Sequence, residues 1–127
     1  MSHRFQKHYT REEARALLPE VRRWLDRLWE LRIAMETDDQ RLSGLMATGL
    51  DSGGDLVNHS VKGLVDLRSQ LHEFQQREIF IKDLQRGLVD FPAFIGGREV
   101  FLCWEKDEED IEYWHDIDSG YANREPI

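Results

Sequence analysis

The chain has 127 residues, of which 40% are hydrophobic and 33% are charged, and its formal net charge is −8 at pH 7. A chain of this length forms one domain with one modest core, and its apolar content exceeds that of disordered chains. The acidic balance argues against sequence-independent binding to nucleic acid, because that binding depends on Lys and Arg contacts with phosphates. We therefore expect a folded, helix-rich protein that does not bind nucleic acid.

Neither export nor membrane insertion is indicated by the sequence. No apolar run approaches the roughly 20 residues that a membrane-spanning helix needs, and residues 1–8 lack the apolar centre of a secretory signal. Cys103 is the only cysteine, so an internal disulfide bond cannot form. We predict a cytoplasmic protein that does not bind a membrane.

A long first helix is predicted after Thr10. The side chains of Thr10 and Glu13 have the spacing of a capping box, in which each accepts a hydrogen bond from the other residue's backbone N–H. Pro19 predicts either a kink or a short separate helix, because it lacks a backbone donor. The apolar residues of this region follow the heptad spacing of a coiled coil: Leu17, Val21, Trp24, Leu28, Leu31 and Met35. The pattern predicts a helix that packs against another helix.

A second helix is predicted after a loop near residues 43–54, where glycine, serine and aspartate interrupt the apolar pattern. Helical spacing resumes near Asp55 and continues to about Arg86, and Gly87 suits the left-handed conformation that ends many helices. The two helices are expected to form a long antiparallel hairpin within residues 1–87.

The apolar period changes from helical to alternating after the second helix. Leu88 to Phe91, Arg98 to Trp104 and Ile111 to Asp116 are predicted as three strands, followed by a C-terminal tail. The predicted fold class is α+β, mainly α: a long antiparallel helical hairpin, then a small three-stranded antiparallel β meander in residues 88–127. The whole chain, residues 1–127, is expected to form a single domain.

The first helix carries more apolar surface than a two-helix hairpin can cover. Leu18, Leu25 and Trp29 widen its apolar arc to roughly 160°. The β unit reaches only one end of so long a hairpin, so we predict a homodimer through the helix faces, arranged as a four-helix bundle. Residues 105–118 carry −7 of the net charge, either as a solvated turn or as a docking surface for the Arg-rich end of the first helix.

Polar residues near the strands form a candidate site. Five are expected to converge where the second helix meets the first strand and the C-terminus returns: Asp83, Arg86, Asp90, His115 and Arg124. They form either structural ion pairs or a ligand-binding site in which Arg86 and Arg124 hold a small anion. His115 and Asp90 are the candidate catalytic residues, because imidazole titrates near neutral pH and can act as a general base.

A metal site has weak sequence support. The predicted helices contain no His-x-x-x-His, Cys-x-x-Cys or Glu-x-x-His spacing. His115 with Asp116 is the remaining candidate pair of metal ligands. Cys103 has no cationic neighbour in the sequence and is expected to be a small buried residue rather than a nucleophile. No cofactor is predicted.

Several motifs between Tyr9 and Ile127 carry a family resemblance: Leu17-Leu18-Pro19, Arg86 to Pro92, Leu102-Cys103-Trp104 and Tyr113-Trp114-His115. Together they resemble the bacterial family named domain of unknown function 2203. The resemblance implies a family identity and no activity.

Two classes of function remain open. The favoured one is a non-enzymatic protein-interaction or assembly module that acts as a homo-oligomer and can recognise a protein partner. The long helices, the uneven charge and the lack of a catalytic signature support it. The alternative is a small ligand-binding protein or enzyme with a polar site around His115, Asp90 and Arg124. A pocket lined by those side chains would favour the alternative.

Overall fold

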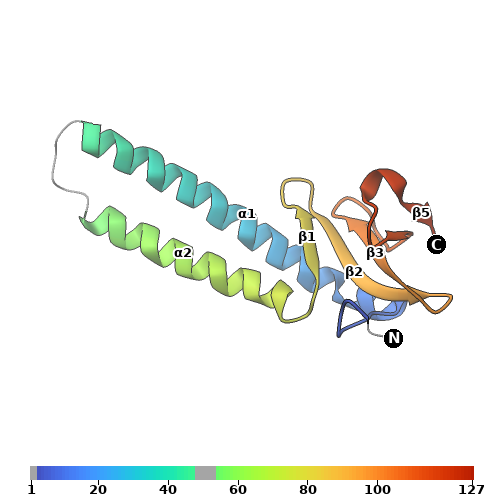
Figure 1. Cartoon of the computed structure of the whole chain (residues 1–127). Coiled ribbons are helices and arrows are strands. Elements are labelled where there is room, and N and C mark those ends of the chain that lie inside the picture. Colours follow the sequence, from blue (N-terminus) through green and yellow to red (C-terminus); the bar gives the residue numbers. More distant parts are fainter. Residues whose placement is uncertain (1–2, 48–53) are drawn as a thin grey trace.

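Figure 1 shows the computed structural model of the chain, in which residues 3–47 and 54–127 are described. A hairpin of two helices, α1 (Arg11–Ala47) and α2 (Gly54–Gln75), is joined at one end to an antiparallel sheet. The strands and the short 3-10 helix η1 are β1 (Phe80–Asp83), β2 (Leu88–Ile95), β3 (Arg98–Glu105), β4 (Tyr113–Asp116), η1 (Tyr121–Asn123) and β5 (Glu125–Pro126). Neither described helix is long and apolar enough to cross a membrane.

α1 begins as predicted. The N–H of Glu13 donates to Thr10 Oγ1 at 3.1 Å and the N–H of Thr10 donates to Glu13 Oε1 at 3.0 Å, which confirms the capping box. The helix runs without a break through Pro19, so the alternative of a short separate helix is wrong. It continues to Ala47, past the start of the predicted loop, and residues 48–53 of that loop lie outside the described residues.

α2 ends at Gln75, not near Arg86 as predicted. The chain leaves the helix through a Schellman motif, in which the N–H of Ile79 donates to the carbonyl of Phe74 and the N–H of Glu78 donates to that of Gln75, both at 3.1 Å. Glu78 occupies the left-handed position of the motif with φ 53°, where glycine is usual. Because no glycine marks this helix end, the apolar residues that follow suggested a longer helix, and they form β1 instead.

Within the described part of the chain the sheet has five antiparallel strands in the order β1-β2-β3-β4-β5, so the prediction of three strands is wrong. β2, β3 and β4 are the predicted meander, and Gly96 and Gly97 make the turn between β2 and β3. β1 pairs with β2 at one edge, and β5 pairs with β4 at the other. β5 has only two residues, so it is too short for an alternating pattern to reveal it.

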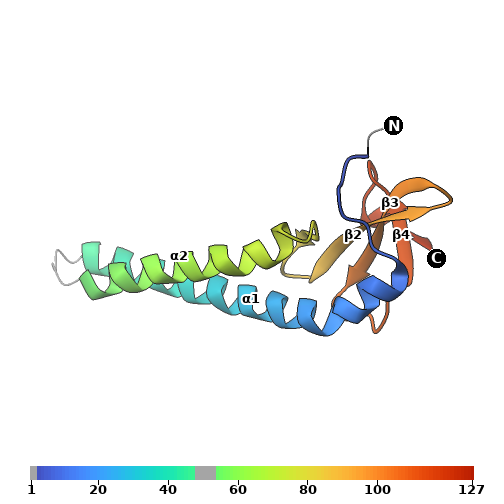
Figure 2. The ribbon, with the colours of Figure 1, turned by 90° about the horizontal axis from the view of Figure 1, so that it is seen from below.

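The core lies between α1 and one face of the sheet. It contains Ala14, Leu18, Val21, Leu25 and Leu28 from α1 with Val89, Phe91, Ala93, Val100, Leu102 and Trp104 from β2 and β3. Successive strand residues point to opposite faces, so the residues between these positions face away from α1. Figure 2 shows that the hairpin extends well beyond the sheet.

The chain itself covers part of the wide apolar arc of α1. Leu18 and Leu25 are buried against the sheet, and Trp24 packs edge-on to Phe74 with 5.6 Å between ring centroids. Trp29 is 37% exposed. The sheet therefore covers Leu18 and Leu25, whereas Trp29 keeps part of its surface exposed.

Arginines of α1 hold the acidic segment, residues 105–118, against the helix. Arg15 makes two hydrogen bonds to Asp110 at 2.8 and 2.9 Å, and Arg11 donates to the carbonyl of Ile111 at 2.7 Å. The Arg15 guanidinium and the N–H of Ile111 hold the pKa of the Asp110 carboxyl below its usual value. The segment is therefore a docking surface for α1 within the molecule, which is one of the two predicted alternatives.

The sheet face turned away from α1 is covered by the N-terminal segment and the C-terminal tail. The ring of Phe5 lies 5.1 Å from that of Phe80 and 5.2 Å from that of Phe101. Residues 119–121, in the tail that precedes β5, border a cavity on this face. This second, partly polar layer contains the candidate site.

Candidate functional site

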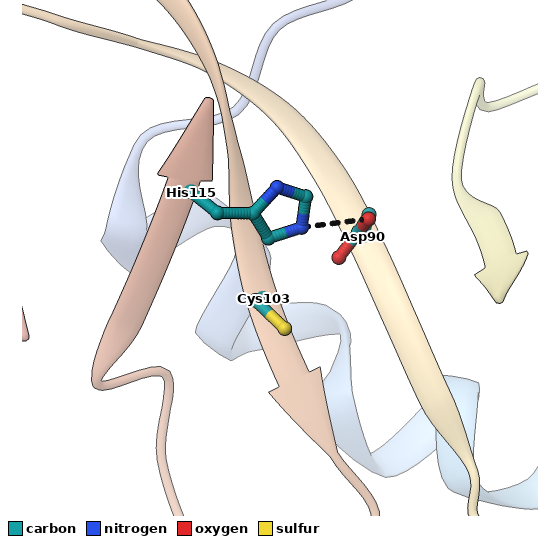
Figure 3. A group of neighbouring side chains, drawn as sticks. All are labelled: Asp90, Cys103 and His115. Atoms are coloured by element: carbon teal, nitrogen blue, oxygen red, sulfur yellow. Dashed lines mark hydrogen bonds and ion pairs between the residues drawn. The ribbon is translucent and has the colours of Figure 1, made fainter. Parts of the chain in front are cut away.

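Three neighbouring strands place Asp90, Cys103 and His115 next to one another. Asp90 of β2 lies directly opposite Cys103 of β3, and His115 of β4 lies opposite Phe101, two residues before Cys103. Because alternate side chains share a face, all three point to the side away from α1. Figure 3 shows them converging, and their exposed fractions are 1%, 0% and 3%.

The His115 ring is held by two contacts. Its Nδ1 lies 2.7 Å from the backbone carbonyl oxygen of Asp116, and its Nε2 lies 3.0 Å from Oδ2 of Asp90. A carbonyl oxygen can only accept, so Nδ1 carries a proton and donates. The orientation of the ring is therefore fixed, with Nε2 directed at Asp90.

The second carboxylate oxygen of Asp90 lacks a partner. Oδ1 of Asp90 is buried and accepts no hydrogen bond from any residue in the described ranges 3–47 and 54–127. A buried acceptor without a partner destabilises a protein by about 1–3 kcal/mol, so such atoms are rare. The Asp90 carboxylate group lies within 4.8 Å of the Cys103 thiol and the His115 imidazole, so this is a polar cluster inside the sheet layer.

The surroundings of His115 raise its pKa. Burial, the largest single influence, lowers its pKa, but hydrogen bonds with Asp90, Cys103 and the Asp116 carbonyl, with the charge of Asp90, outweigh it. Together they raise the pKa of His115 to about 10.

The same three side chains fit a metal ion. A thiol sulfur, an imidazole nitrogen and a carboxylate oxygen all lie within 4.8 Å of one another. A tetrahedral zinc ion with bonds of about 2.0–2.3 Å places its ligand atoms about 3.3–3.7 Å apart, so small side-chain movements would close the site. Metal-bound histidines generally donate their other ring N–H to a carbonyl or carboxylate, as His115 does to Asp116.

A cavity of about 250 Å³ adjoins the three side chains. Its other lining residues are Lys82, Leu88, Ser119, Gly120 and Tyr121. They come from β1, β2, the loop after β4 and η1, so the C-terminal tail forms one wall of the cavity. A metal ion at the three side chains would thus have one side directed into this cavity.

The structure brings only part of the predicted site together. Asp90 and His115 are in contact, whereas Arg86 pairs with Glu105 at 3.0 Å and Arg124 pairs with Glu108 at 3.1 Å. Both guanidinium groups lie 4.2 Å from the ring centroid of Tyr121, which they help to hold against the sheet. Each arginine therefore has its own carboxylate partner.

Two further predicted residues lie outside the cluster. The Asp83 side chain accepts a hydrogen bond from the backbone N–H of Arg86 at 3.1 Å, within the turn between β1 and β2. The Asp116 side chain forms an ion pair with Arg98, and only its backbone carbonyl contacts His115. Asp116 thus supports the imidazole ring without offering its carboxylate as a ligand.

Sequence reasoning missed Cys103 as a candidate ligand and Lys82 as a cavity residue. Alternation within strands does place Phe101 and Cys103 on one face, but it does not say which residues of β2 and β4 lie beside them. The helical pattern predicts Lys82 at the end of the second helix, so nothing in the sequence indicates that it lies near Asp90. Knowledge of the strand register would have shown both.

The fold and the site define a class of protein in which a helical hairpin carries a small antiparallel sheet with a buried Asp-Cys-His cluster. The sequence model of the family described as Uncharacterized conserved protein (DUF2203) matches residues 7–127, and the chain belongs to this family. None of the curated proteins and none of the solved structures compared with the chain matches it.

Proposed function

We propose that the protein binds one divalent transition metal ion, best fitted by zinc, through Asp90, Cys103 and His115. The observation that carries this proposal is the convergence of a buried Asp90 carboxylate, the Cys103 thiol and the His115 imidazole within 4.8 Å, with Oδ1 of Asp90 left without a partner among the described residues. A cation at this position would give the oxygen a partner. It would also replace the protons of the thiol and the imidazolium, which metal binding releases.

The types of ligand atom favour zinc over harder cations. Mg²⁺ and Ca²⁺ take oxygen ligands almost exclusively, whereas zinc combines thiolate, imidazole and carboxylate ligands. Structural zinc sites have four protein ligands, and sites with three leave a position for water or another ligand. The three side chains beside a cavity match the second kind.

The proposal is tested with protein that carries no histidine tag. We expect about one equivalent of zinc after purification, and cobalt substitution should produce the near-ultraviolet absorption of a cobalt–thiolate bond. Cys103→Ser should abolish that absorption, and His115→Gln should lose the metal. His59→Gln is the matched control, because His59 pairs with Asp38 in the hairpin.

Wild-type protein decides the outcome even if a variant fails to fold. Wild-type protein that retains no zinc and shows no cobalt–thiolate absorption would refute the metal site. Equal loss of metal in the His59→Gln control would show that the effect of the variants is not specific to the site.

We also propose that two copies associate through the hairpin. Large apolar side chains with exposed fractions of 37–56% remain on both helices: Trp29, Ile33, Val57, Val61, Leu64 and Val65. Arg32 of α1 and Leu67 of α2 line one cavity of about 380 Å³. Trp29 and Leu64 lie one helical turn from those residues, so they flank the same side of the hairpin.

A second copy is the occupant that this surface fits best. The exposed residues lie at positions 29–33 of α1 and 57–65 of α2, so a partner that covers them needs an apolar face that contacts both helices. A second copy presents such a face, and a two-fold contact pairs the same surface on both subunits. The hairpin would then join two metal-binding sheets that lie apart.

A further inference from the structure

We infer that the open coordination position of the proposed metal ion takes a small oxyanion, a carboxylate or a phosphate, whose charge Lys82 balances. This inference rests on the proposed metal site and names the class of ligand that the site receives. It follows from the position of Lys82, from its lack of an ion-pair partner within residues 3–47 and 54–127, and from the charge of the occupied site.

The ring contacts of Lys82 place it on the face of the sheet that holds the three ligands. Phe80 lies opposite Asp90 and Phe101 opposite His115, and Lys82 Nζ lies over both rings. The pairing of β1 with β2 shifts between Ile81 and Asp83. Lys82 is the residue within this irregularity, and bulges of this kind commonly redirect a side chain next to a site.

Lys82 has no carboxylate partner among the residues that the structure describes. Its Nζ lies 5.2 Å from the ring centroid of Phe101 and 5.5 Å from that of Phe80, which hold the ammonium group by cation–π contacts. The same side chain lines the cavity together with Asp90, Cys103 and His115. The ammonium group of Lys82 therefore belongs to a side chain that lines the cavity next to the proposed metal ligands.

The charges of the occupied site favour an anion. A divalent cation, the Asp90 carboxylate, the Cys103 thiolate and a neutral His115 sum to zero. Lys82 adds one positive charge, and Asp90 is the only acidic residue among the described residues that line the cavity. A monoanionic oxygen ligand on the metal would bring the summed charge of the metal, its three ligands and Lys82 to zero. The cavity volume of about 250 Å³ limits this ligand to a small molecule.

Arg86 and Arg124, which the sequence suggests as ligands of a small anion, do not compete with Lys82 for the anion. Arg86 and Arg124 are already paired with Glu105 and Glu108, and they stack on the ring of Tyr121 at the wall of the cavity. Their role is to hold Tyr121 in place. Among the described residues that line the cavity, Lys82 is therefore the cation that an anion there can reach.

The test uses cobalt-loaded full-length protein titrated with inorganic phosphate and, separately, with acetate. The cobalt–thiolate absorption reports the metal site, and the visible cobalt bands report exchange of the fourth ligand. We expect phosphate or acetate to shift the visible bands without loss of cobalt. In Lys82→Gln the anion Kd should rise at least about tenfold at unchanged cobalt content, because one charge-assisted hydrogen bond is lost.

Lys62→Gln is the matched control, because Lys62 lines a separate cavity between the helices. This variant should bind the anion as the wild type does. Bound cobalt whose visible bands respond to neither anion, or an anion Kd unchanged in Lys82→Gln, would overturn the inference and leave the metal site intact. Absence of the cobalt–thiolate absorption itself would instead refute the proposed function.

Discussion

Glu78 ties the N-terminal segment to the end of α2 by accepting a hydrogen bond from the backbone N–H of Lys7 at 2.7 Å. The same Oε1 atom accepts the N–H of Gln6 at 2.8 Å. Glu78 has φ 53°, a conformation that costs a non-glycine residue about 1–2 kcal/mol. The two hydrogen bonds offset this cost, which explains why a glutamate stands where glycine usually ends a helix.

Substitutions at Glu78 should separate these two contributions. Glu78→Ala loses both hydrogen bonds and keeps the unfavourable backbone, so we expect a destabilisation of about 1–3 kcal/mol. Glu78→Gly loses the same bonds but adopts positive φ freely, so it should be destabilised less. Chemical denaturation of both variants measures the difference. An alanine variant as stable as the glycine variant, or more so, would contradict the account.

Gly87 should tolerate alanine less well than Gly96 does. Both have positive φ, 68° and 59°, so an alanine side chain is strained at either position by about 1–2 kcal/mol. At Gly87 the added Cβ would also lie 2.5 Å from Cβ of Lys106, whereas at Gly96 no atom of the described residues lies within 4 Å. Thermal and chemical unfolding should therefore show that Gly87→Ala is clearly less stable than Gly96→Ala. Equal stability of the two variants would refute this close approach of the turn and Lys106.

Stability should fall in acid as Glu99 becomes protonated. Its side chain accepts hydrogen bonds from the N–H of Arg4 at 2.9 Å and of Phe5 at 3.2 Å, and contacts His8 Nε2 at 2.7 Å. Burial is the largest influence and raises its pKa, but these contacts outweigh it and lower the pKa of Glu99 below 4.5. Because the folded pKa is the lower one, the stabilisation is complete above pH 4.5 and is lost as the pH falls through the folded pKa.

Glu99→Gln provides the measurement. Glutamine has an amide nitrogen in place of one carboxylate oxygen, and this nitrogen cannot accept the hydrogen bonds made to that oxygen. The variant should therefore be less stable than wild type by about 1–2 kcal/mol at neutral pH. The difference should shrink towards zero in acid. A difference that stays constant from neutral pH to acid would contradict the assigned role of Glu99.

One acidic side chain introduced into the exposed apolar surface should prevent two copies from associating through the hairpin. We expect the wild-type chain to sediment as a dimer at micromolar concentrations and Leu64→Glu to sediment as a monomer, because Leu64 lies in the exposed apolar surface. Asn123→Asp, at an exposed position of the C-terminal tail, is the control and should remain a dimer. A folded wild-type monomer would contradict the association, as would a Leu64→Glu variant that stays dimeric.

Local patterns predicted those parts of the fold that depend on local interactions. Thr10 and Glu13 mark the start of α1 because a capping box is complete within four residues. The β2–β3–β4 meander follows from alternation and from the Gly96-Gly97 turn. The end of α2 was missed because its Schellman motif contains Glu78 in place of glycine. That glutamate is stabilised by residues about 70 positions away, which no local window contains.

The candidate site depended on information that local patterns lack. Asp90 and His115 were expected to meet, yet Cys103 between Leu102 and Trp104 has the sequence context of a core residue. Its contact with Asp90 arises from cross-strand pairing, and its distance to His115 arises from the diagonal across β3 and β4. The charges of Arg86 and Arg124 suggested an anion site, but Glu105 and Glu108 pair with them in the folded chain.

The most direct test of the central claim is the X-ray absorption spectrum of zinc in the untagged wild-type protein. We expect about one zinc per chain, bound to one sulfur at about 2.3 Å and to nitrogen or oxygen ligands at about 2.0–2.2 Å. The sulfur contribution should vanish in Cys103→Ser. A protein without zinc, or a spectrum that shows only nitrogen and oxygen ligands, would contradict the assignment of Asp90, Cys103 and His115 as a metal centre.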